Sequence, residues 1–240
     1  MGMNFRGIPI NPINPKFPIN PNKNMKKPRI PKFINLKHYR VAIFGSARIK
    51  PNDSSYKQVY ALAKMIAKEG IDVVTGGGPG LMEAANKGHQ HGREKDMVRS
   101  FGLNIKLPKE QIANKHLDIK KEFARFSERL DYFMYLSNIV VVAPGGIGTL
   151  LELMYTWQLV QVEQVCNIPI ILLGKMWPPF LSWFRKWILA KQFVTHADMH
   201  PIFIAENIQD AIKIIRMAYE DHQKGGPDVC NNYKKYRIKY

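Results

Sequence analysis

The sequence predicts an α/β protein with a doubly wound parallel sheet and helices on both faces. Short apolar runs alternate with helical patterns from residue 40 onward, and two runs lead directly into glycine-rich loops at residues 76–80 and 144–149. The chain has 240 residues, 45% hydrophobic and 23% charged, which suits one soluble domain with a substantial core. We therefore expect a single Rossmann-like domain over residues 38–222, an extended basic arm at 1–37 and a basic tail at 223–240.

The first half of this domain is expected to contain three strands and two helices. An apolar run at 41–44 predicts a buried parallel strand, and residues 71–75 predict a second one. Between them, Asp53 and the two following serines offer N-caps for a helix that Gly70 closes. Further elements are expected as a helix at 81–89, with His89 and His91 exposed at its end, and a strand at 100–105.

The second half continues the alternation. The pattern predicts a helix at 122–136, a strand at 139–143, a helix from 147 toward 164, a strand at 168–173 and a closing helix at 206–220. Aromatic residues also recur at helical spacing after two prolines, at Trp177, Phe180, Trp183, Phe184 and Trp187. This spacing favours core or dimer packing. Membrane-surface insertion stays open, because Arg185, Lys186 and Lys191 lie among these aromatic residues.

The net charge of +17 belongs mainly to the two ends of the chain. Residues 1–40 hold nine basic side chains and no acid, and the last seven residues hold four more, which leaves +4 for the middle. Seven of the 16 prolines lie in the first 31 residues, so we expect an extended or disordered arm. A solvated tail is favoured over docking on a partner subunit or tethering to RNA or an anionic membrane. The folded part itself gives no nucleic-acid signal.

Cysteine content and hydropathy indicate the compartment. Cys166 and Cys230 are the only cysteines, too few for a disulfide framework and consistent with a reducing cytoplasm. No apolar run approaches the roughly 18 residues that a membrane-spanning helix needs, and the N-terminus lacks a secretory pattern. We therefore expect a cytoplasmic protein without a membrane span.

Both glycine-rich loops follow a strand and precede a helix. A helix N-terminus presents unpaired N–H groups and a partial positive charge, and glycine lets an anion approach the backbone. Neither loop is a Walker motif or a clean GxGxxG, so dinucleotide oxidoreduction is not indicated. Two such loops at two strand ends predict one nucleotide site.

The residues TGGGPGLMEAANKG (75–88) and PGGIGTLLE (144–152) resemble the Lonely Guy (LOG) family, often labelled "lysine decarboxylase". The resemblance extends over about residues 40–220, including FGSAR (44–48) and GLNI (102–105). It implies a phosphoribohydrolase that cleaves nucleoside 5′-monophosphates, AMP or N6-modified AMP as in cytokinin activation, into free base and ribose 5-phosphate. It also implies a homodimer or larger assembly.

Site residues are carried over by matching the family's motifs. Glu152 and Arg129 match its catalytic pair, and the phosphate loop comprises Gly145, Gly146, Ile147, Gly148 and Thr149. The remaining pocket wall matches Ser46 and the loop 76–80, which includes Gly77, Gly78 and Gly80, and Glu110 matches a substrate-contacting acid. The sequence departs from the family's pattern at three positions, which puts base selectivity in doubt. Leu130 replaces a lysine, Leu151 replaces an acid and Gln158 replaces a threonine.

The residues themselves fit this chemistry. Glycosidic cleavage builds oxocarbenium character on the ribose, which a carboxylate such as Glu152, expected in the first turn of its helix, stabilises. A cation such as Arg129 can hold substrate oxygens. We expect no organic cofactor or metal, since neither the pair His196 and His200 nor any lysine lies in a recognisable metal or pyridoxal-phosphate motif. The alternative is a non-catalytic protein that binds or senses a nucleotide on the same scaffold.

Overall fold

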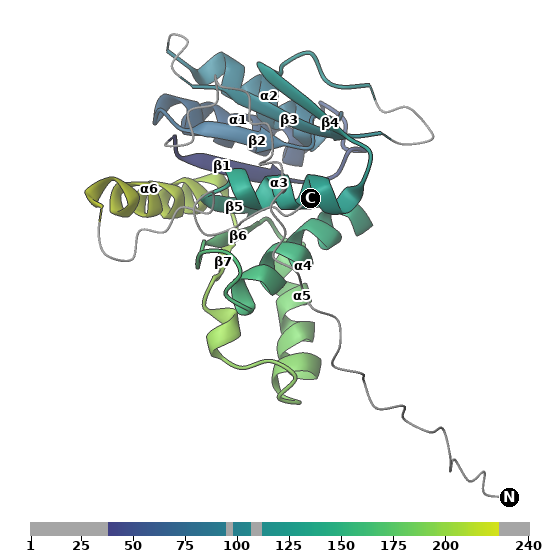
Figure 1. Ribbon diagram of the computed structural model, residues 1–240, viewed down its shortest axis with the longest axis vertical. Coiled ribbons are helices and arrows are strands. Elements are labelled where there is room, and N and C mark those ends of the chain that lie inside the picture. Colours follow the sequence, from purple (N-terminus) through teal and green to yellow (C-terminus); the bar gives the residue numbers. More distant parts are fainter. Residues whose placement is uncertain (1–37, 95–97, 107–111, 226–240) are drawn as a thin grey trace, which may run out of the picture.

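The structure, a computed structural model, describes residues 38–94, 98–106 and 112–225. Within them, seven strands form one sheet in the order β4-β3-β2-β1-β5-β6-β7, which confirms the predicted α/β fold (Figure 1). The arm at 1–37 and the tail from residue 226 lie outside the described residues. The strands are β1 (Arg40–Phe44), β2 (Asp72–Thr75), β3 (Ser100–Ile105), β4 (Ile119–Phe123), β5 (Ile139–Val142), β6 (Ile170–Leu173) and β7 (Ile202–Ala205). The helices are α1 (Ser54–Lys68), α2 (Leu81–Gly92), α3 (Phe126–Leu136), α4 (Ile147–Gln161), α5 (Trp177–Phe184), η1 (Arg185–Leu189), η2 (Ala197–Met199) and α6 (Ile208–Lys224).

The first strand, β1, lies in the middle of the sheet, and later strands are added first on one side of it and then on the other. The chain runs from β1 outward through β2 and β3 to β4, then returns to β5 on the other side of β1, and every pairing is parallel. Val41 of β1 therefore pairs with Val73 on one side and Ile139 on the other. The loops that follow β1 and β5 leave the sheet in different directions, and ligands of open parallel sheets bind in the crevice at such a point.

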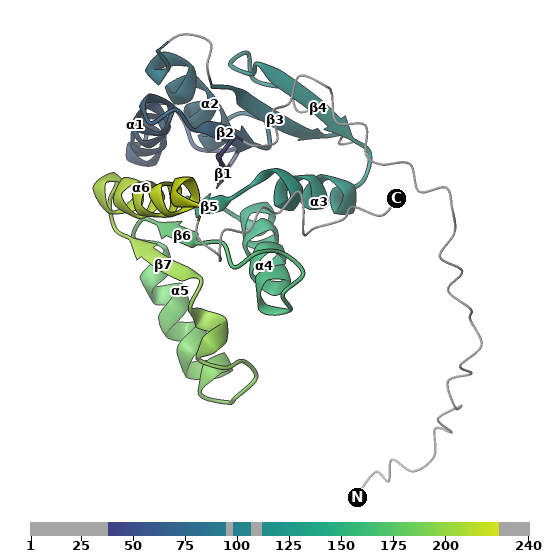
Figure 2. The same cartoon turned by 60° about the vertical axis from the view of Figure 1, so that its left-hand side comes forward.

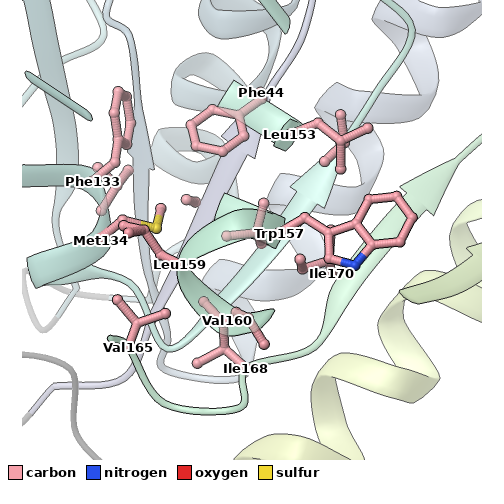
Figure 3. Packing of buried hydrophobic residues seen from close by; sticks show 14 of the residues in the cluster. Phe44, Phe133, Met134, Leu153, Trp157, Leu159, Val160, Val165, Ile168 and Ile170 are labelled. Atoms are coloured by element: carbon pink, nitrogen blue, oxygen red, sulfur yellow. The ribbon is translucent and has the colours of Figure 1, made fainter. Parts of the chain in front are cut away.

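Helices cover both faces of the sheet (Figures 1 and 2). On one face α1, α2 and α6 pack over Val41 and Ile43 of β1, and on the other α3, α4 and α5 pack over Ala42 and Phe44. Side chains of a strand alternate between the faces, so both sets are apolar only when both faces are buried. Figure 3 shows the second core, in which Phe133 of α3 and residues of α4 gather around Phe44. This packing fixes the two helices that carry Arg129 and Glu152.

Helix boundaries follow local signals where those are strong. The Asp53 carboxylate accepts a hydrogen bond from the Ser55 N–H at 2.7 Å, and Gly70 follows the helix with φ +74°, both as predicted for α1. Helix α2 runs three residues beyond its predicted end. Helix α4 ends at Gln161 rather than near residue 164, because Glu163 adopts a positive φ of 56° that a helix cannot contain.

Two edge strands correct the sequence prediction. Residues 122–125 were predicted as helix, but β4 occupies Ile119–Phe123 and α3 begins only at Phe126. β4 is half exposed at the sheet edge, so its middle residues are charged. These charged residues favour a helix prediction, and Ile119 and Phe123 are the only apolar residues of the strand. β7, at the opposite edge, was also not predicted, although its four residues are all apolar, because so short an apolar run does not distinguish a strand from a helix segment.

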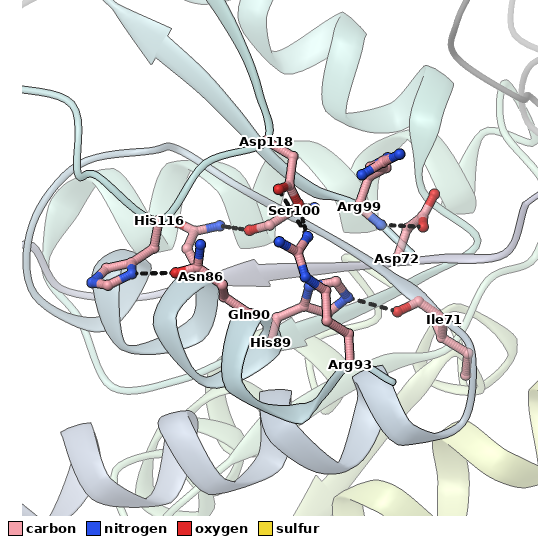
Figure 4. A network of polar contacts seen from close by, with 10 residues as sticks. All are labelled: Ile71, Asp72, Asn86, His89, Gln90, Arg93, Arg99, Ser100, His116 and Asp118. Carbon is pink, nitrogen blue, oxygen red and sulfur yellow. Dashed lines mark hydrogen bonds and ion pairs between the residues drawn. The ribbon is translucent and has the colours of Figure 1, made fainter. Parts of the chain in front are cut away.

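A polar network on the side of α2 corrects the predicted exposure of His89 (Figure 4). The His89 side chain is fully buried, with Nε2 3.0 Å from the Ile71 carbonyl oxygen, and burial lowers the pKa of this imidazole. Asp118 accepts hydrogen bonds from the Ser100 N–H and the Arg93 guanidinium, at 2.8 Å each. His91 is exposed as predicted. The network ties α2 and the segment before β4 to β3.

The aromatic residues of α5 and η1 divide between core and surface. Trp177 and Phe184 are buried, as core packing predicts. Trp183 and Trp187 are exposed by 53% and 49%, so about half of each side chain is open to solvent in this single chain. Dimer packing and membrane-surface insertion remain open predictions for these two tryptophans.

Candidate functional site

A pocket of about 470 Å³ opens at the carboxyl edge of the sheet, where β1 and β5 adjoin. Its walls come from the loop after β1, the first residue after β2, the end of β3, and the starts of α2, α3 and α4. The lining residues are Gly45, Ser46, Ala47, Arg48, Gly76, Met82, Ile105, Phe126, Arg129, Gly146, Ile147, Gly148, Thr149 and Glu152. The volume lies within the range of about 300–1,000 Å³ that small-molecule sites occupy.

Arg129 and Glu152 form an ion pair in the wall of this pocket. The Arg129 Nη2 lies 2.6 Å from the Glu152 Oε1, and each side chain is only 11% exposed. Burial raises the pKa of the Glu152 carboxyl to about 7, and the Arg129 guanidinium opposes that rise. Burial also lowers the pKa of Arg129, opposed by the Glu152 carboxylate. A buried carboxyl poised near neutrality beside a fixed cation is typical of a functional site.

The position of Arg129 depends on a glycine. A Cβ atom on Gly76 would lie 2.8 Å from the Arg129 Nη2, so a side chain at this position would displace the guanidinium. The guanidinium also lies over the Phe133 ring, 5.4 Å from its centroid. Its buried Nε has no hydrogen-bond partner within the described part of the chain. A bound ligand with an acceptor oxygen would satisfy that N–H group.

The start of α4 forms the opposite wall. Gly146 is the N-cap residue and no side chain caps the helix, so the N–H groups of the first turn are open to an anion. Gly145 permits the close approach of Thr149, since a Cβ on Gly145 would lie 2.6 Å from the Thr149 Cβ. Glu152 is the sixth residue of α4, so it lies in the second turn and not in the first as predicted.

Backbone hydrogen bonds through Ser46 join three loops around the pocket. The Ser46 N–H donates to the Pro144 carbonyl at 3.0 Å, and the Ser46 carbonyl accepts from the Leu81 N–H at 2.9 Å. The Ser46 hydroxyl in turn accepts from the Arg48 N–H at 3.1 Å. The loops after β1, β2 and β5 are therefore held in one fixed arrangement.

The structure brings most of the sequence-predicted residues to this pocket. Arg129, Glu152, Ser46 and the segment 146–149 all line it, and Gly145 supports the loop from behind. Glu110 lies outside the described residues.

Gly77, Gly78 and Gly80 do not line the pocket. The Gly78 carbonyl accepts a hydrogen bond from Asn114 Nδ2 at 3.0 Å, and the Gly77 N–H donates to the Thr75 hydroxyl at 2.9 Å. Gly80 has a φ of +69° and packs against the backbone of Ser46 and Ala47. These glycines shape the loop, and its first residue, Gly76, is the one that lines the pocket.

Sequence reasoning missed six of the lining residues. They are Gly45, Ala47, Arg48, Met82, Ile105 and Phe126. Several of these residues follow or end a predicted strand, so they were expected at the carboxyl edge of the sheet. That position was the signal that could have identified them as lining residues. Phe126 carried none, because it was predicted to lie inside a helix that in fact begins there.

Two other features concern metals and membranes. His196 and His200 flank the short helix η2, and no group of three or more potential metal ligands occurs among the residues that the structure describes. Over the same residues, none of the helices combines the length and apolar character needed to cross a membrane.

The fold and pocket define a class: a Rossmann-like α/β protein with an open helix N-terminus and a buried Arg–Glu pair in one pocket. Residues 82–215, more than half of the chain, match the family described as "Possible lysine decarboxylase". The chain therefore belongs to this family, which confirms the resemblance to LOG proteins.

Curated relatives include the pyrimidine/purine nucleotide 5′-monophosphate nucleosidase of Escherichia coli K12. The two sequences are 29% identical over 180 residues, which cover 68% of this chain. The same alignment covers 35% of the relative, so this chain spans about a third of the length of the curated relatives it matches.

Solved structures with a similar fold include a molybdenum cofactor binding protein from Rippkaea orientalis, with a TM-score of 0.57 and 21% identity over 76% of this chain and 98% of that one. The molybdenum cofactor carrier protein of Chlamydomonas reinhardtii gives a TM-score of 0.56 and 21% identity, over 76% of this chain and 99% of that one. At this identity the likeness shows the fold alone, and it confirms the Rossmann-like architecture.

Proposed function

We propose that this protein hydrolyses the N-glycosidic bond of nucleoside 5′-monophosphates, with AMP or an N6-modified AMP as substrate, to free base and ribose 5-phosphate. The observation that carries the proposal is the buried Arg129–Glu152 pair in the same pocket as the open N-terminus of α4. Membership of the family and the similarity to nucleotide 5′-monophosphate nucleosidases support it.

The phosphate would bind at the first turn of α4. The N–H groups of residues 147–149 carry no side-chain cap, and the helix dipole favours an anion there. Glu152 lies one turn deeper along the same helix, so a ribose attached to that phosphate would extend toward its carboxyl group. Apolar side chains of Met82, Ile105 and Phe126 are left in the wall for the base.

The chemistry needs one carboxylate and one water. As the C1′–N bond breaks, its electron pair passes to the base and positive charge develops on the ribose, which ionised Glu152 stabilises. A water then forms the new C1′–O bond, and Glu152 accepts the proton that this water loses, since its pKa of about 7 suits a general base at neutral pH. The departing base gains the proton that Glu152 took from the water, which returns Glu152 to its ionised form, so the sum of the reaction is hydrolysis.

Arg129 has two tasks in this scheme. Its Nη2 holds Glu152 in place, and its unpaired Nε is free to donate to a substrate oxygen. We further propose a homodimer or larger assembly, which light scattering of the purified chain would measure.

The test is a panel of purine and pyrimidine nucleoside monophosphates, with free base scored by chromatography and Glu152→Gln as the control. Base release by the wild type and its loss in the variant support the proposal. AMP binding by calorimetry without base release from any monophosphate would instead establish the alternative, a non-catalytic nucleotide-binding protein.

A further inference from the structure

We infer that Arg48 supplies the positive charge that holds the 5′-phosphate, and that it thereby selects nucleotides over unphosphorylated nucleosides. This inference rests on the proposed function, because it assigns a further residue to the same pocket. The argument begins with the charges of the lining residues. Among the residues that the structure describes they are three: Arg48 in the loop after β1, Arg129 in α3 and Glu152 in α4.

Arg129 is committed to another partner. Its guanidinium is bonded to the Glu152 carboxylate at 2.6 Å, so the two charges largely neutralise each other. A phosphate monoester carries nearly two negative charges at neutral pH, whereas a helix N-terminus contributes only about half a positive charge. The start of α4 alone therefore leaves most of the phosphate charge uncompensated.

Among the described lining residues, Arg48 is the cation that has no ion-pair partner. Its side chain is exposed and makes no ion pair with any of the described residues. Its guanidinium presents a planar fork of donors that matches phosphate oxygens in a bidentate manner. The competing explanation is a solvated surface arginine with no role in binding. The fixed position of the loop that carries Arg48 argues against it.

The loop that carries Arg48 is fixed relative to α4. Ser46 bonds through its backbone N–H to Pro144, at the start of the phosphate loop, and through its hydroxyl to the Arg48 N–H. β1 and β5 are neighbours in the sheet, so the loops that follow them line one pocket from adjacent positions. Only the Arg48 side chain, and not its backbone, would need to become ordered when the phosphate binds.

The experiment measures binding of ribose 5-phosphate and of adenosine by calorimetry in four proteins: wild type, Arg48→Ala, Arg48→Lys and Lys50→Ala. Lys50 is the matched control, an exposed cation two residues further along the same loop that does not line the pocket. Arg48→Ala should weaken ribose 5-phosphate binding by about ten- to a hundredfold, the range for lost hydrogen bonds to a charged group. The ribose 5-phosphate affinity of Arg48→Lys should lie between those of the wild type and Arg48→Ala, because lysine keeps the charge and loses the planar fork of donors.

Adenosine separates a phosphate contact from a general effect on the pocket. Its binding should be unchanged in all four proteins, and Lys50→Ala should bind both ligands as the wild type does. Affinity of the wild type for ribose 5-phosphate should also fall with added salt more steeply than that of Arg48→Ala.

Each outcome decides a separate point. Equal ribose 5-phosphate affinity in wild type and Arg48→Ala overturns the inference, and so does an equal loss for ribose 5-phosphate and adenosine. Neither result touches base release by the wild type, which tests the proposed function on its own. A wild type that binds ribose 5-phosphate through Arg48 but releases no base keeps the inference and refutes the hydrolase.

Discussion

Replacing Glu152 by Gln removes the buried negative charge while keeping the size and hydrogen-bonding capacity of the side chain. If the carboxylate acts mainly in the transition state, turnover should fall by about a hundredfold or more, the usual effect of losing a positioned base or electrostatic group. AMP binding should persist, because in the proposed scheme the first turn of α4, and not Glu152, would hold the phosphate. This combination, lost turnover with retained affinity, separates a catalytic carboxylate from one that only binds substrate.

The raised pKa of Glu152 determines the direction and the size of the expected pH dependence of kcat/KM. A carboxyl group with a pKa of about 7 is protonated below that pH and ionised above it, so kcat/KM should rise from pH 5 to pH 8. About one carboxyl in a hundred is ionised at pH 5 and about half at pH 7, so kcat/KM should be about fiftyfold lower at pH 5 than at pH 7. An ordinary glutamate would give almost no change over this interval.

The assay is base release from AMP in single turnovers between pH 5 and 8.5, with calorimetric affinity for AMP measured alongside. Glu163→Gln is the matched control, since Glu163 is an exposed glutamate just beyond the other end of α4. Near-normal turnover in Glu152→Gln would show that the assigned chemistry is wrong. A wild-type profile without an inflection near pH 7 would show that the titration of Glu152 does not govern the rate.

Three further outcomes follow from the same pocket. Arg129→Ala should abolish most turnover and weaken AMP binding. It should also lower stability by about 3–5 kcal/mol in denaturant titrations at pH 8, because the buried Glu152 carboxyl must then stay charged without its partner or take up a proton on folding, and by less at pH 6, where protonation costs less. AMP should be cleaved at least a hundredfold faster than adenosine in parallel base-release assays, because phosphate binding energy is used in the transition state; equal rates would contradict an anion site. Gly145→Ala should lower the melting temperature and weaken AMP binding in calorimetry, because the new Cβ meets Thr149; an unperturbed variant would mean that the loop relaxes freely.

The fold was largely readable from the sequence because its central strands are buried on both faces. Runs such as residues 139–142 are apolar throughout, and caps such as Asp53 act over two or three residues, so both signals are local. β4 escaped prediction because an edge strand is half exposed and its sequence need not be apolar. β7 is apolar but only four residues long, too short for its pattern to distinguish a strand from a helix segment. His89 was assigned to the wrong environment for a related reason: whether a helix end is buried depends on what packs against it.

The sequence alone determined the two glycine-rich loops, their place after buried strands, and the motif that contains Glu152. Only the tertiary structure decided that Arg129, 23 residues earlier, reaches that carboxylate. It likewise decided that Arg48, in the loop after β1, lines the same pocket. It also decided the pKa of Glu152, since desolvation depends on what surrounds the group and not on its neighbours in sequence. Such contacts form because β1 and β5 lie side by side in the sheet although almost a hundred residues separate them, a distance over which sequence patterns carry no information.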